Sequence, residues 1–328
     1  MKYVYVLTSS ENDIYYEQFL LSLASMRLYN PDAEVITLID EKTKQGLTGK
    51  RSGYEKLVSR IIILKAPGEL SQKETSRWIK TSVRNHLSGD FIFIDCDTII
   101  TDSIVCNIPD EIKIGAVLDT HVSLSLHHQK NEFLRQITAS RFNDNIQPVD
   151  YFNSGVVFCR DAPETAEFYD CWNKLWVKSS MHGVSADQPS FNYTNYEFSG
   201  IIHKLSGEWN CQTSHNGLPF LHNAKIIHYY ATSLNSVDPA FKLSSPPVFA
   251  SIKETGELSS EIMKLLENPK SAFEPLSRIV SDSTVIEALD SSFLFKLIRF
   301  NKRHPWLSKR WNSFSGFLIR FVKRLSGK

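Results

Sequence analysis

Short apolar runs alternate with amphipathic stretches along roughly the first half of the chain. Segments with the length and apolar content of β-strands occur at residues 3–7, 34–39, 60–64, 91–94, 114–118 and 155–158. Helical spacing of apolar residues separates several of them, as in the stretch that begins near Tyr16 and stops before Pro31, at residues 73–87, and from Pro163 to Lys178. Strands that alternate with helices predict an α/β fold whose central sheet is mostly parallel.

The strongest chemical signal follows the fourth run, in the segment FIFIDCDTII. Four apolar residues from Phe91 to Ile94 are typical of a strand that is buried on both faces, and ligands of such sheets bind at the carboxyl ends of strands. Asp95 and Asp97 share a face if the segment is extended. Two adjacent carboxylates favour a cation between them, and their oxygens suit Mg²⁺ or Mn²⁺ bridged to substrate phosphates. The alternative is that both aspartates merely solvate a strand end.

Composition indicates an ordinary globular protein, with 328 residues of which 42% are hydrophobic and 22% charged. This length allows one large α/β domain, alone or with an appendage. Its five cysteines are widely spaced and include no Cys-x-x-Cys, so we expect neither a disulfide framework nor structural zinc, and a reducing cytosol fits best. The N-terminal segment has the pattern of a first strand rather than of a signal peptide.

Charge is distributed unevenly along the chain. Ten of the 37 Lys and Arg residues, and none of the 36 Asp and Glu residues, lie from Ser291 onward, so residues 1–290 carry a formal charge of −9. In this tail Pro305 divides two helical patterns, and the second places aromatic residues on one face and cations mainly on others. That pattern predicts attachment to an anionic membrane surface without spanning it.

Other interpretations of the tail are packing against the rest of the chain, a protein partner, or nucleic acid. Nothing else in the sequence favours nucleic acid, because residues 1–290 are acidic and contain no helix-turn-helix or zinc pattern. We therefore expect no nucleic-acid partner, and a location in the cytoplasm, peripheral on the cytoplasmic face of a membrane.

Four motifs occur in a fixed order: FIFIDCDTII, YFNSGVVF, the pair Asp187-Gln188, and KIIHYY at residues 225–230. Together they resemble the retaining glycosyltransferases of family 8, which have the GT-A fold. That family includes glycogenin-like proteins and bacterial lipopolysaccharide galactosyl- and glucosyltransferases. The resemblance covers about residues 1–235, and the basic tail is also similar to that of the bacterial members. We expect a catalytic domain at 1–245, a helical connecting segment at 246–290 and a membrane-association tail at 291–328.

The resemblance implies a metal site in which Asp95, Asp97 and His228 bind Mn²⁺, or Mg²⁺, bridging the two phosphates of the donor. By itself, a lone histidine such as His228 is more often a satisfied residue at a strand end. The family likewise places Asp187 against hydroxyls of the donor sugar and Gln188 near the anomeric carbon, and these are the expected catalytic residues. An N-cap role is the structural alternative for Asp187.

Implied donor-binding residues are Thr8, Asn12, Arg77, Asp95, Cys96 and Asn153. Of these, Thr8 and Asn12 correspond to positions that bind uracil and ribose, and Asn153 to one that holds sugar hydroxyls, although an asparagine there can also cap a turn. We expect Lys80, three residues after Arg77, to lie on a solvated basic face. Weaker candidates for the acceptor side are Asp119 and His121.

The sequence departs from the family at two places. Residues 229–234 lack the usual glycine and lysine after His228, and Pro189 replaces the last residue of the usual Asp-Gln-Asp. The expected activity is metal-dependent transfer of glucose or galactose from a UDP-sugar to a glycan or glycolipid. One alternative, a sugar-phosphate nucleotidyltransferase, requires a glycine-rich phosphate loop, but Thr8 to Asn12 contain no glycine. The other is a catalytically silent sugar-nucleotide-binding or membrane scaffold protein, which the missing glycine and lysine favour.

Overall fold

A computed structural model describes residues 1–104, 108–142, 150–230 and 241–273, together with six single positions between 296 and 306. Residues 1–277 form one compact unit, and residues 278–328 are assigned to a second. The predicted catalytic boundary after residue 245 falls inside the first unit, because the next two helices belong to it. The predicted basic tail lies almost entirely outside the described residues. No helix among those residues is long and apolar enough to cross a bilayer.

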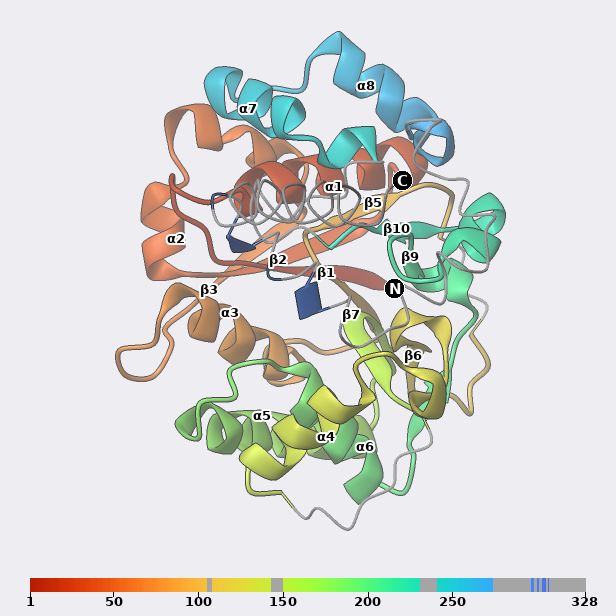
Figure 1. The fold of residues 1–328 in the computed structure, drawn as a ribbon. Coiled ribbons are helices and arrows are strands. Elements are labelled where there is room, and N and C mark those ends of the chain that lie inside the picture. Colours follow the sequence, from red (N-terminus) through yellow and green to blue (C-terminus); the bar gives the residue numbers. More distant parts are fainter. Residues whose placement is uncertain are drawn as a thin grey trace, which may run out of the picture. The chain divides into compact units, whose positions relative to one another are not determined.

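A seven-stranded sheet with the order β3-β2-β1-β4-β7-β6-β8 forms the centre of the first unit (Figure 1). Its strands are β1 (Lys2–Leu7), β2 (Glu34–Asp40), β3 (Arg60–Leu64), β4 (Phe91–Ile94), β6 (Ile114–Leu118), β7 (Phe152–Cys159) and β8 (Ile202–Lys204). Only β7 runs antiparallel to its neighbours β4 and β6, and the other neighbouring strands are parallel. The predicted α/β fold with a mostly parallel central sheet is confirmed.

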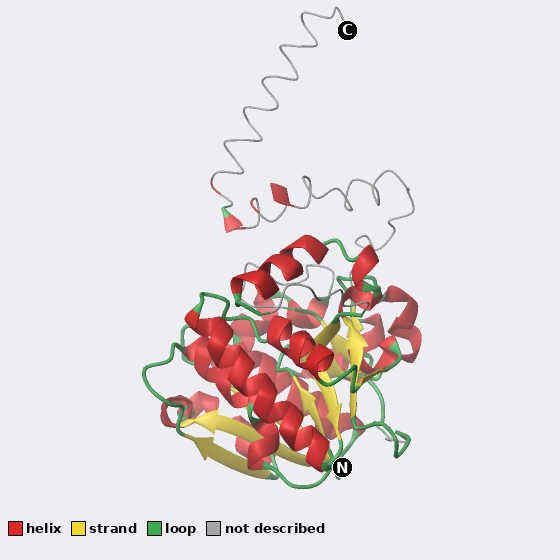
Figure 2. Cartoon of the chain, turned by 90° about the horizontal axis from the view of Figure 1, so that it is seen from below, coloured by secondary structure: helices red, strands yellow, loops and turns green. Residues whose placement is uncertain are grey.

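Helices cover both faces of this sheet. One face carries α1 (Tyr15–Tyr29), α7 (Pro246–Thr255) and α8 (Ser260–Glu267), and the other carries α3 (Gln72–Thr81), α4 (Lys130–Ala139), α5 (Pro163–Met181) and α6 (Gln188–Glu197). Alternation along β1 explains the two layers: Tyr5 and Leu7 join the core with α1, whereas Val4 and Val6 join the core with α3 and α5. Figure 2, in which the molecule is seen from below, shows helices in front of the strands.

Shorter elements connect these layers. Helix α2 (Glu41–Gly46) follows β2, and Asp40 caps it by accepting from the backbone of Thr43 at 3.3 Å. The 3₁₀ helices are η1 (Gly49–Arg51), η2 (Gly53–Lys56), η3 (Val83–His86), η4 (Asp119–His121), η5 (Leu124–Leu126), η6 (Gly207–Asn210), η7 (Leu218–Asn223), η8 (Lys242–Ser244) and η9 (Pro269–Ser271).

Helix α1 differs from a typical surface helix. Every residue from Tyr16 to Met26 is buried, including Glu17 and Gln18. The reason is that α7 and α8 pack against α1 on the side away from the central sheet. A helix that is covered on all sides gives only a weak amphipathic pattern, so its sequence does not reveal the outer pair of helices.

A second, three-stranded sheet was not predicted from the sequence. Its strands β5 (Thr98–Ile100), β9 (Cys211–Gln212) and β10 (Ile226–His228) have the order β5-β10-β9. Because β5 begins just after Asp97 and pairs antiparallel with β10, the register places His228 opposite Thr98. This pairing brings together residues that lie about 130 positions apart in the sequence.

Candidate metal centre and active site

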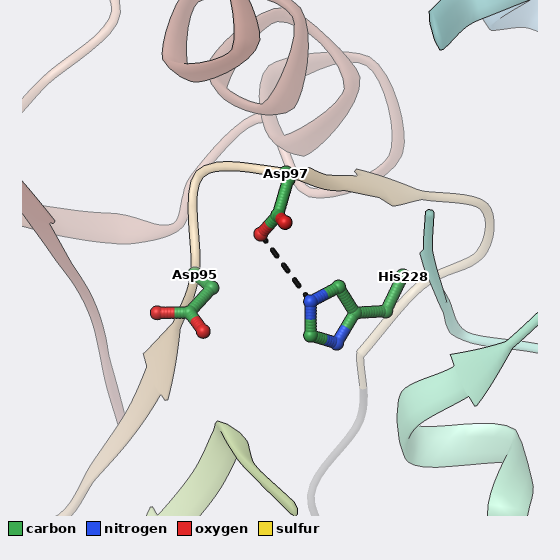
Figure 3. A group of neighbouring side chains, drawn as sticks. All are labelled: Asp95, Asp97 and His228. Carbon is green, nitrogen blue, oxygen red and sulfur yellow. Dashed lines mark ion pairs between the residues drawn. The ribbon is translucent and has the colours of Figure 1, made fainter. Parts of the chain in front are cut away.

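Asp95, Asp97 and His228 converge where β4 ends and the two sheets meet (Figure 3). One ligand atom from each of the three lies within 4.8 Å of the others, and Nε2 of His228 is 3.3 Å from Oδ1 of Asp97. The backbone N–H of Tyr229 donates to the carbonyl of Asp97 at 3.2 Å, which fixes the approach of β10. These three residues are the predicted metal ligands, and the structure brings all of them together.

The ring of His228 is held from behind by Asn210, a residue that sequence reasoning missed. Nδ1 of His228 donates to Oδ1 of Asn210 at 3.0 Å, while Nδ2 of Asn210 donates to Oδ1 of Asn153 at 2.8 Å. Both asparagines are buried. Because Nδ1 carries the proton, Nε2 presents its lone pair toward Asp95 and Asp97, as a metal-binding imidazole requires.

Gly155 lies directly beneath this group. An ideal Cβ at that position would fall 2.9 Å from Oδ2 of Asp95, and closer still to Cε1 of His228. Contacts shorter than 3.0 Å force a shift in packed side chains, so only glycine leaves room for the three ligands. The glycine that the sequence places after Asn153 therefore has a steric role in the metal site.

Lys80 contradicts the prediction of a solvated face. It is only 3% exposed, and its ammonium group lies 3.0 Å from Oδ2 of Asp187 and 3.2 Å from both oxygens of Asp95. Its nitrogen also lies 5.0 Å from the centre of the Phe93 ring. The prediction failed because the C-terminal end of α3, which carries Lys80, packs against the carboxyl ends of the central strands, where the acidic residues cluster.

Asp187 is the most strongly paired acid of the site. Nε of Arg77 lies 2.9 Å from its Oδ1, and Ser154 donates to its Oδ2 at 2.8 Å. Burial alone would raise the pKa of Asp187, but Arg77 and Lys80 outweigh it and hold the pKa well below its usual range. Asp187 stands just before α6 yet makes no side-chain cap to that helix, so the structural alternative for it fails.

The pKa values of the two acids in the metal group are shifted in opposite directions. Burial raises the pKa of Asp95, against the attraction of Lys80, and the neighbouring charge of Asp97 adds to the rise. Burial would also raise the pKa of Asp97, but His228 lowers it below its usual value. Two carboxylates and one imidazole at this spacing fit a divalent ion, whose positive charge would balance the carboxylates together with that of Lys80.

A pocket opens beside the metal group at the end of β1. Its lining residues include Thr8, Arg77, Asp95, Cys96 and Asp97, together with Val6, Leu7, Tyr15, Gln18, Lys73 and Ser76. The Sγ of Cys96 lies 3.4 Å from the carbonyl of Val6. Five of the predicted donor and metal residues therefore share one cavity. Asn12 is exposed in the turn before α1 and does not line this pocket.

Asn153 and Gln188 lie on the other side of the metal group. Strand β7 begins at Phe152, so Asn153 sits inside a buried strand, where its Oδ1 accepts locally from the backbone N–H of Gly155 at 2.9 Å. Its Nδ2 donates to Oδ1 of Asp119 at 2.9 Å, to the hydroxyl of Tyr230 at 2.7 Å and, at 3.3 Å, to Oε1 of Gln188. Gln188 begins α6, and Pro189 fits the first helical turn, where no backbone donor is needed.

A family model now decides between the interpretations of this site. The model described as glycosyl transferase family 8 matches residues 90–233, which contain the two aspartates, Asn153, Asp187, Gln188 and His228. Residues 90–233 of this chain therefore belong to glycosyltransferase family 8. The predicted family is confirmed, and the chain is a glycosyltransferase.

Solved structures of family members resemble this glycosyltransferase only distantly. The apo form of mouse xyloside xylosyltransferase 1 shares 16% identity and has a TM-score of 0.46, covering 73% of this chain and 99% of that one. The galactosyltransferase LgtC, solved with donor and acceptor sugar analogues, shares 13% identity and has a TM-score of 0.48, covering 80% of this chain and 99% of LgtC. No curated protein matches the sequence.

One departure from the family pattern is the missing glycine and lysine after His228. The segment after Tyr230, where the usual glycine and lysine are missing, lies outside the described residues. Within the described part, the lysine that contacts the acidic group is Lys80 on α3. Sequence reasoning had a signal for it, since Lys80 lies one helical turn after Arg77 on a helix that precedes the Asp95 strand.

Proposed function

We propose that this glycosyltransferase transfers a hexose, glucose or galactose, from a UDP-sugar to a glycan or glycolipid acceptor, and that it retains the anomeric configuration. Mn²⁺ would be held by Asp95, Asp97 and His228. The observation that carries the proposal is the convergence of these three ligands next to a pocket at the end of β1, with Asp187 and Gln188 on the neighbouring helix.

The ligand set supports Mn²⁺ more than Mg²⁺. Imidazole suits transition metals, whereas Mg²⁺ prefers oxygen ligands alone. Three protein ligands leave coordination positions open for two phosphate oxygens. When bound, such an ion supplies Lewis-acid stabilisation of the charge that develops on a leaving diphosphate.

The protein's own residues have distinct tasks in this proposal. Arg77 and Lys80 keep Asp187 ionised, so that its oxygens remain hydrogen-bond acceptors for hydroxyl groups of the donor sugar. Lys80 also adds a fixed positive charge beside Asp95, at the edge of the phosphate position. Gln188 presents an amide next to Asn153, where the anomeric carbon would lie.

The transfer can proceed without a protein side chain that acts as a base. The bond between the anomeric carbon and the diphosphate oxygen breaks, and the acceptor hydroxyl forms a new bond on the same face. Its proton passes to an oxygen of the leaving diphosphate. In keeping with this route, the acid that lies deepest in the site, Asp187, is held ionised by two cations and is a poor base.

The test is a donor screen with the purified full-length chain. UDP-glucose, UDP-galactose and other common nucleotide sugars are each incubated with and without Mn²⁺, and release of the nucleoside diphosphate is measured. We expect Mn²⁺-dependent release from one UDP-hexose, and its loss in Asp97→Asn. Release from none of the donors, combined with unchanged metal affinity in Asp95→Ala, would contradict the proposal.

We also propose that the enzyme acts at the cytoplasmic face of a membrane. Support comes from the sequence alone, in the ten cations and absent acids of residues 291–328. Removing these residues should abolish sedimentation with vesicles that contain anionic lipid while donor hydrolysis persists. Undiminished sedimentation of the truncated chain would refute this role of the tail.

A further inference from the structure

Three cations lie along one face of α3, at spacings of four and three residues: Lys73, Arg77 and Lys80. Lys80, near the C-terminal end of the helix, is buried between Asp95 and Asp187. Arg77 lies about one turn earlier, with its Nε 2.9 Å from Asp187. Lys73 lies a further turn toward the start of the helix, roughly 6 Å along its axis from Arg77. The row of cations therefore leads away from the buried acids toward the start of α3.

Only two of these cations have an acid beside them. Within the described residues, ion pairs join Arg77 and Lys80 to acids of the site, and none includes Lys73. Glu74, its neighbour in sequence, is engaged elsewhere, because its Oε2 accepts from the backbone N–H of Ser71 at 2.9 Å. Lys73 is exposed, and it lines the pocket at the end of β1, which we call the β1 pocket. It therefore brings an unmatched positive charge to the wall of that pocket.

The first turn of α3 is fixed against the end of β1. Nε2 of Gln72 donates to the carbonyl of Thr8 at 3.0 Å and to Oδ2 of Asp13 at 2.7 Å. The hydroxyl of Thr8 donates in return to the carbonyl of Gln72 at 3.1 Å, and Asp13 also accepts from the backbone N–H of Ser10 at 2.7 Å. Since Gln72 directly precedes Lys73, these contacts fix the backbone from which the lysine extends, and they hold it at the pocket.

The charges around the metal group call for one more cation once a donor is bound. Three acids converge there, Asp95, Asp97 and Asp187. Two cations are paired with them, Lys80 and Arg77. When the acids are ionised this group carries one net negative charge, and a divalent ion changes that to one positive charge. A diphosphate diester, with one charge on each phosphate, returns the balance to one negative charge. Because unbalanced charge is costly in a partly buried site, a further cation in the pocket wall would stabilise the complex.

We propose that Lys73 is a donor-binding residue whose ammonium group pairs with the diphosphate. This inference rests on the proposed function, because it presupposes a nucleoside diphosphate sugar as the substrate. Arg77 and Lys80 are held by Asp187, whereas an exposed lysine can follow the phosphates as they enter the pocket.

The same contact would strengthen during the reaction. When the bond to the anomeric carbon breaks, the leaving oxygen keeps the electron pair, and the diphosphate gains a negative charge before it takes up the proton of the acceptor. A cation that already faces the diphosphate stabilises this added charge without any rearrangement. Lys73 would therefore contribute to donor binding and to departure of the leaving group.

The test compares a ligand that has phosphate groups with one that lacks them, on the full-length chain with Mn²⁺ present. Isothermal titration gives the affinity for UDP, and saturation-transfer NMR gives that for uridine. We expect Lys73→Met to weaken UDP binding at least tenfold, the usual effect of removing a hydrogen bond to a charged group, and to leave uridine binding within about twofold. Lys73→Arg keeps the charge and should hold UDP affinity within a few fold. Mn²⁺ affinity without nucleotide should also stay within about twofold, because Lys73 is not one of the three metal ligands.

A matched control is Lys65→Met. Lys65 is exposed just after β3, so it lies at the same edge of the parallel strands as the metal group, but it does not line the β1 pocket. Loss of the same charge there should change UDP affinity by less than about twofold. Circular dichroism checks that each variant is folded, and Lys73→Gln provides a second neutral variant.

The possible failures are distinguishable. Equal UDP affinities of Lys73→Met and the unsubstituted chain would overturn the proposed contact. Equal weakening of UDP and uridine would assign Lys73 to the nucleoside, and equal losses in Lys73→Met and Lys65→Met would indicate a general field, so either result overturns it as well. If the unsubstituted chain binds UDP but releases it from no donor, the proposed transfer fails while the binding data still decide the role of Lys73. If it does not bind UDP at all, both proposals fail.

Discussion

Nδ1 of His228 lies 3.0 Å from the side-chain oxygen of Asn210, and both residues are buried. This hydrogen bond fixes which nitrogen of the ring faces Asp95 and Asp97. It also links the metal group to Asn153, because the amide of Asn210 donates to that residue on its other side. Proper orientation of the third metal ligand thus depends on a residue that no motif marks.

Asn210→Leu should weaken Mn²⁺ binding by about 10- to 100-fold, the usual effect of removing a partner that orients a metal-binding histidine. Asn210→Asp serves as the matched variant, since a carboxylate still accepts from Nδ1, and it should keep affinity within a few fold. Isothermal titration with Mn²⁺ measures both. Equal affinities for the leucine variant and the unsubstituted chain would show that Asn210 does not orient the ring.

Lys80→Met should destabilise the fold by about 3 kcal/mol, because removal of one partner leaves Asp187 and Asp95 buried with too little positive charge. The exposed Lys73 on the same helix provides the control, and Lys73→Met should change stability by no more than about 0.5 kcal/mol. Urea unfolding gives both free energies. A Lys80 variant as stable as the Lys73 variant would contradict the buried ion pairs.

Gly155→Ala should abolish Mn²⁺ binding while secondary structure persists, because the added methyl group would occupy the space between Asp95 and His228. Gly46→Ala is the control, since a Cβ at Gly46 meets its nearest neighbour, a nitrogen of Arg51, at an ordinary 3.4 Å. Circular dichroism and metal titration separate folding from binding. Normal Mn²⁺ affinity in Gly155→Ala would mean that the ligands do not converge above this glycine.

Acid should weaken the fold through His121. Burial lowers the pKa of His121 from 6.5 to about 4, with an opposing effect of Asp119 and a small further lowering by His215. Its Nε2 accepts from the backbone of Gln212, which protonation prevents. The unfolded chain thus binds this proton more readily, and the related stability is present above pH 6.5 and is lost as the pH falls toward 4.

His121→Gln replaces the titrating acceptor by an amide oxygen, so its loss of stability between pH 7 and pH 5 should be smaller than that of the unsubstituted chain. Thermal unfolding across this range measures the difference. His203→Gln, at an exposed position of β8, should leave the pH dependence unchanged. Identical pH profiles for His121→Gln and the unsubstituted chain would contradict a neutral, hydrogen-bonded His121.

Local sequence signals were sufficient for six of the seven strands of the central sheet, all but β8, and for much of the site. The run from Phe91 to Ile94 forms a strand that is buried on both faces, and the acids that follow it meet His228 as expected. Such strands are recognisable because burial on two faces demands uninterrupted apolar residues. The motifs also singled out Asn153, Asp187 and Gln188, and these lie together: Gln188 accepts from Asn153 at 3.3 Å, and Asp187 accepts from the neighbouring Ser154 at 2.8 Å.

What the sequence could not supply depends on tertiary packing. Strands β8, β9 and β10 have only two or three residues each, too few for a periodic pattern, so neither β8 nor the second sheet was foreseen. Lys80 was misjudged because a lysine's environment is set by the elements around it, here β4 and α6. Helix α1 gave no sign of α7 and α8, since a helix that is buried on nearly all sides, polar residues included, lacks a clear amphipathic pattern.

The most direct test of the account is the stoichiometry and residue dependence of Mn²⁺ binding in the presence of UDP. Isothermal titration of the full-length chain should give one ion per chain, and Asp97→Asn and His228→Asn should each lower the affinity at least tenfold. Unchanged affinity in both variants, or the absence of Mn²⁺ binding by the unsubstituted chain, would contradict a single metal site formed by Asp95, Asp97 and His228.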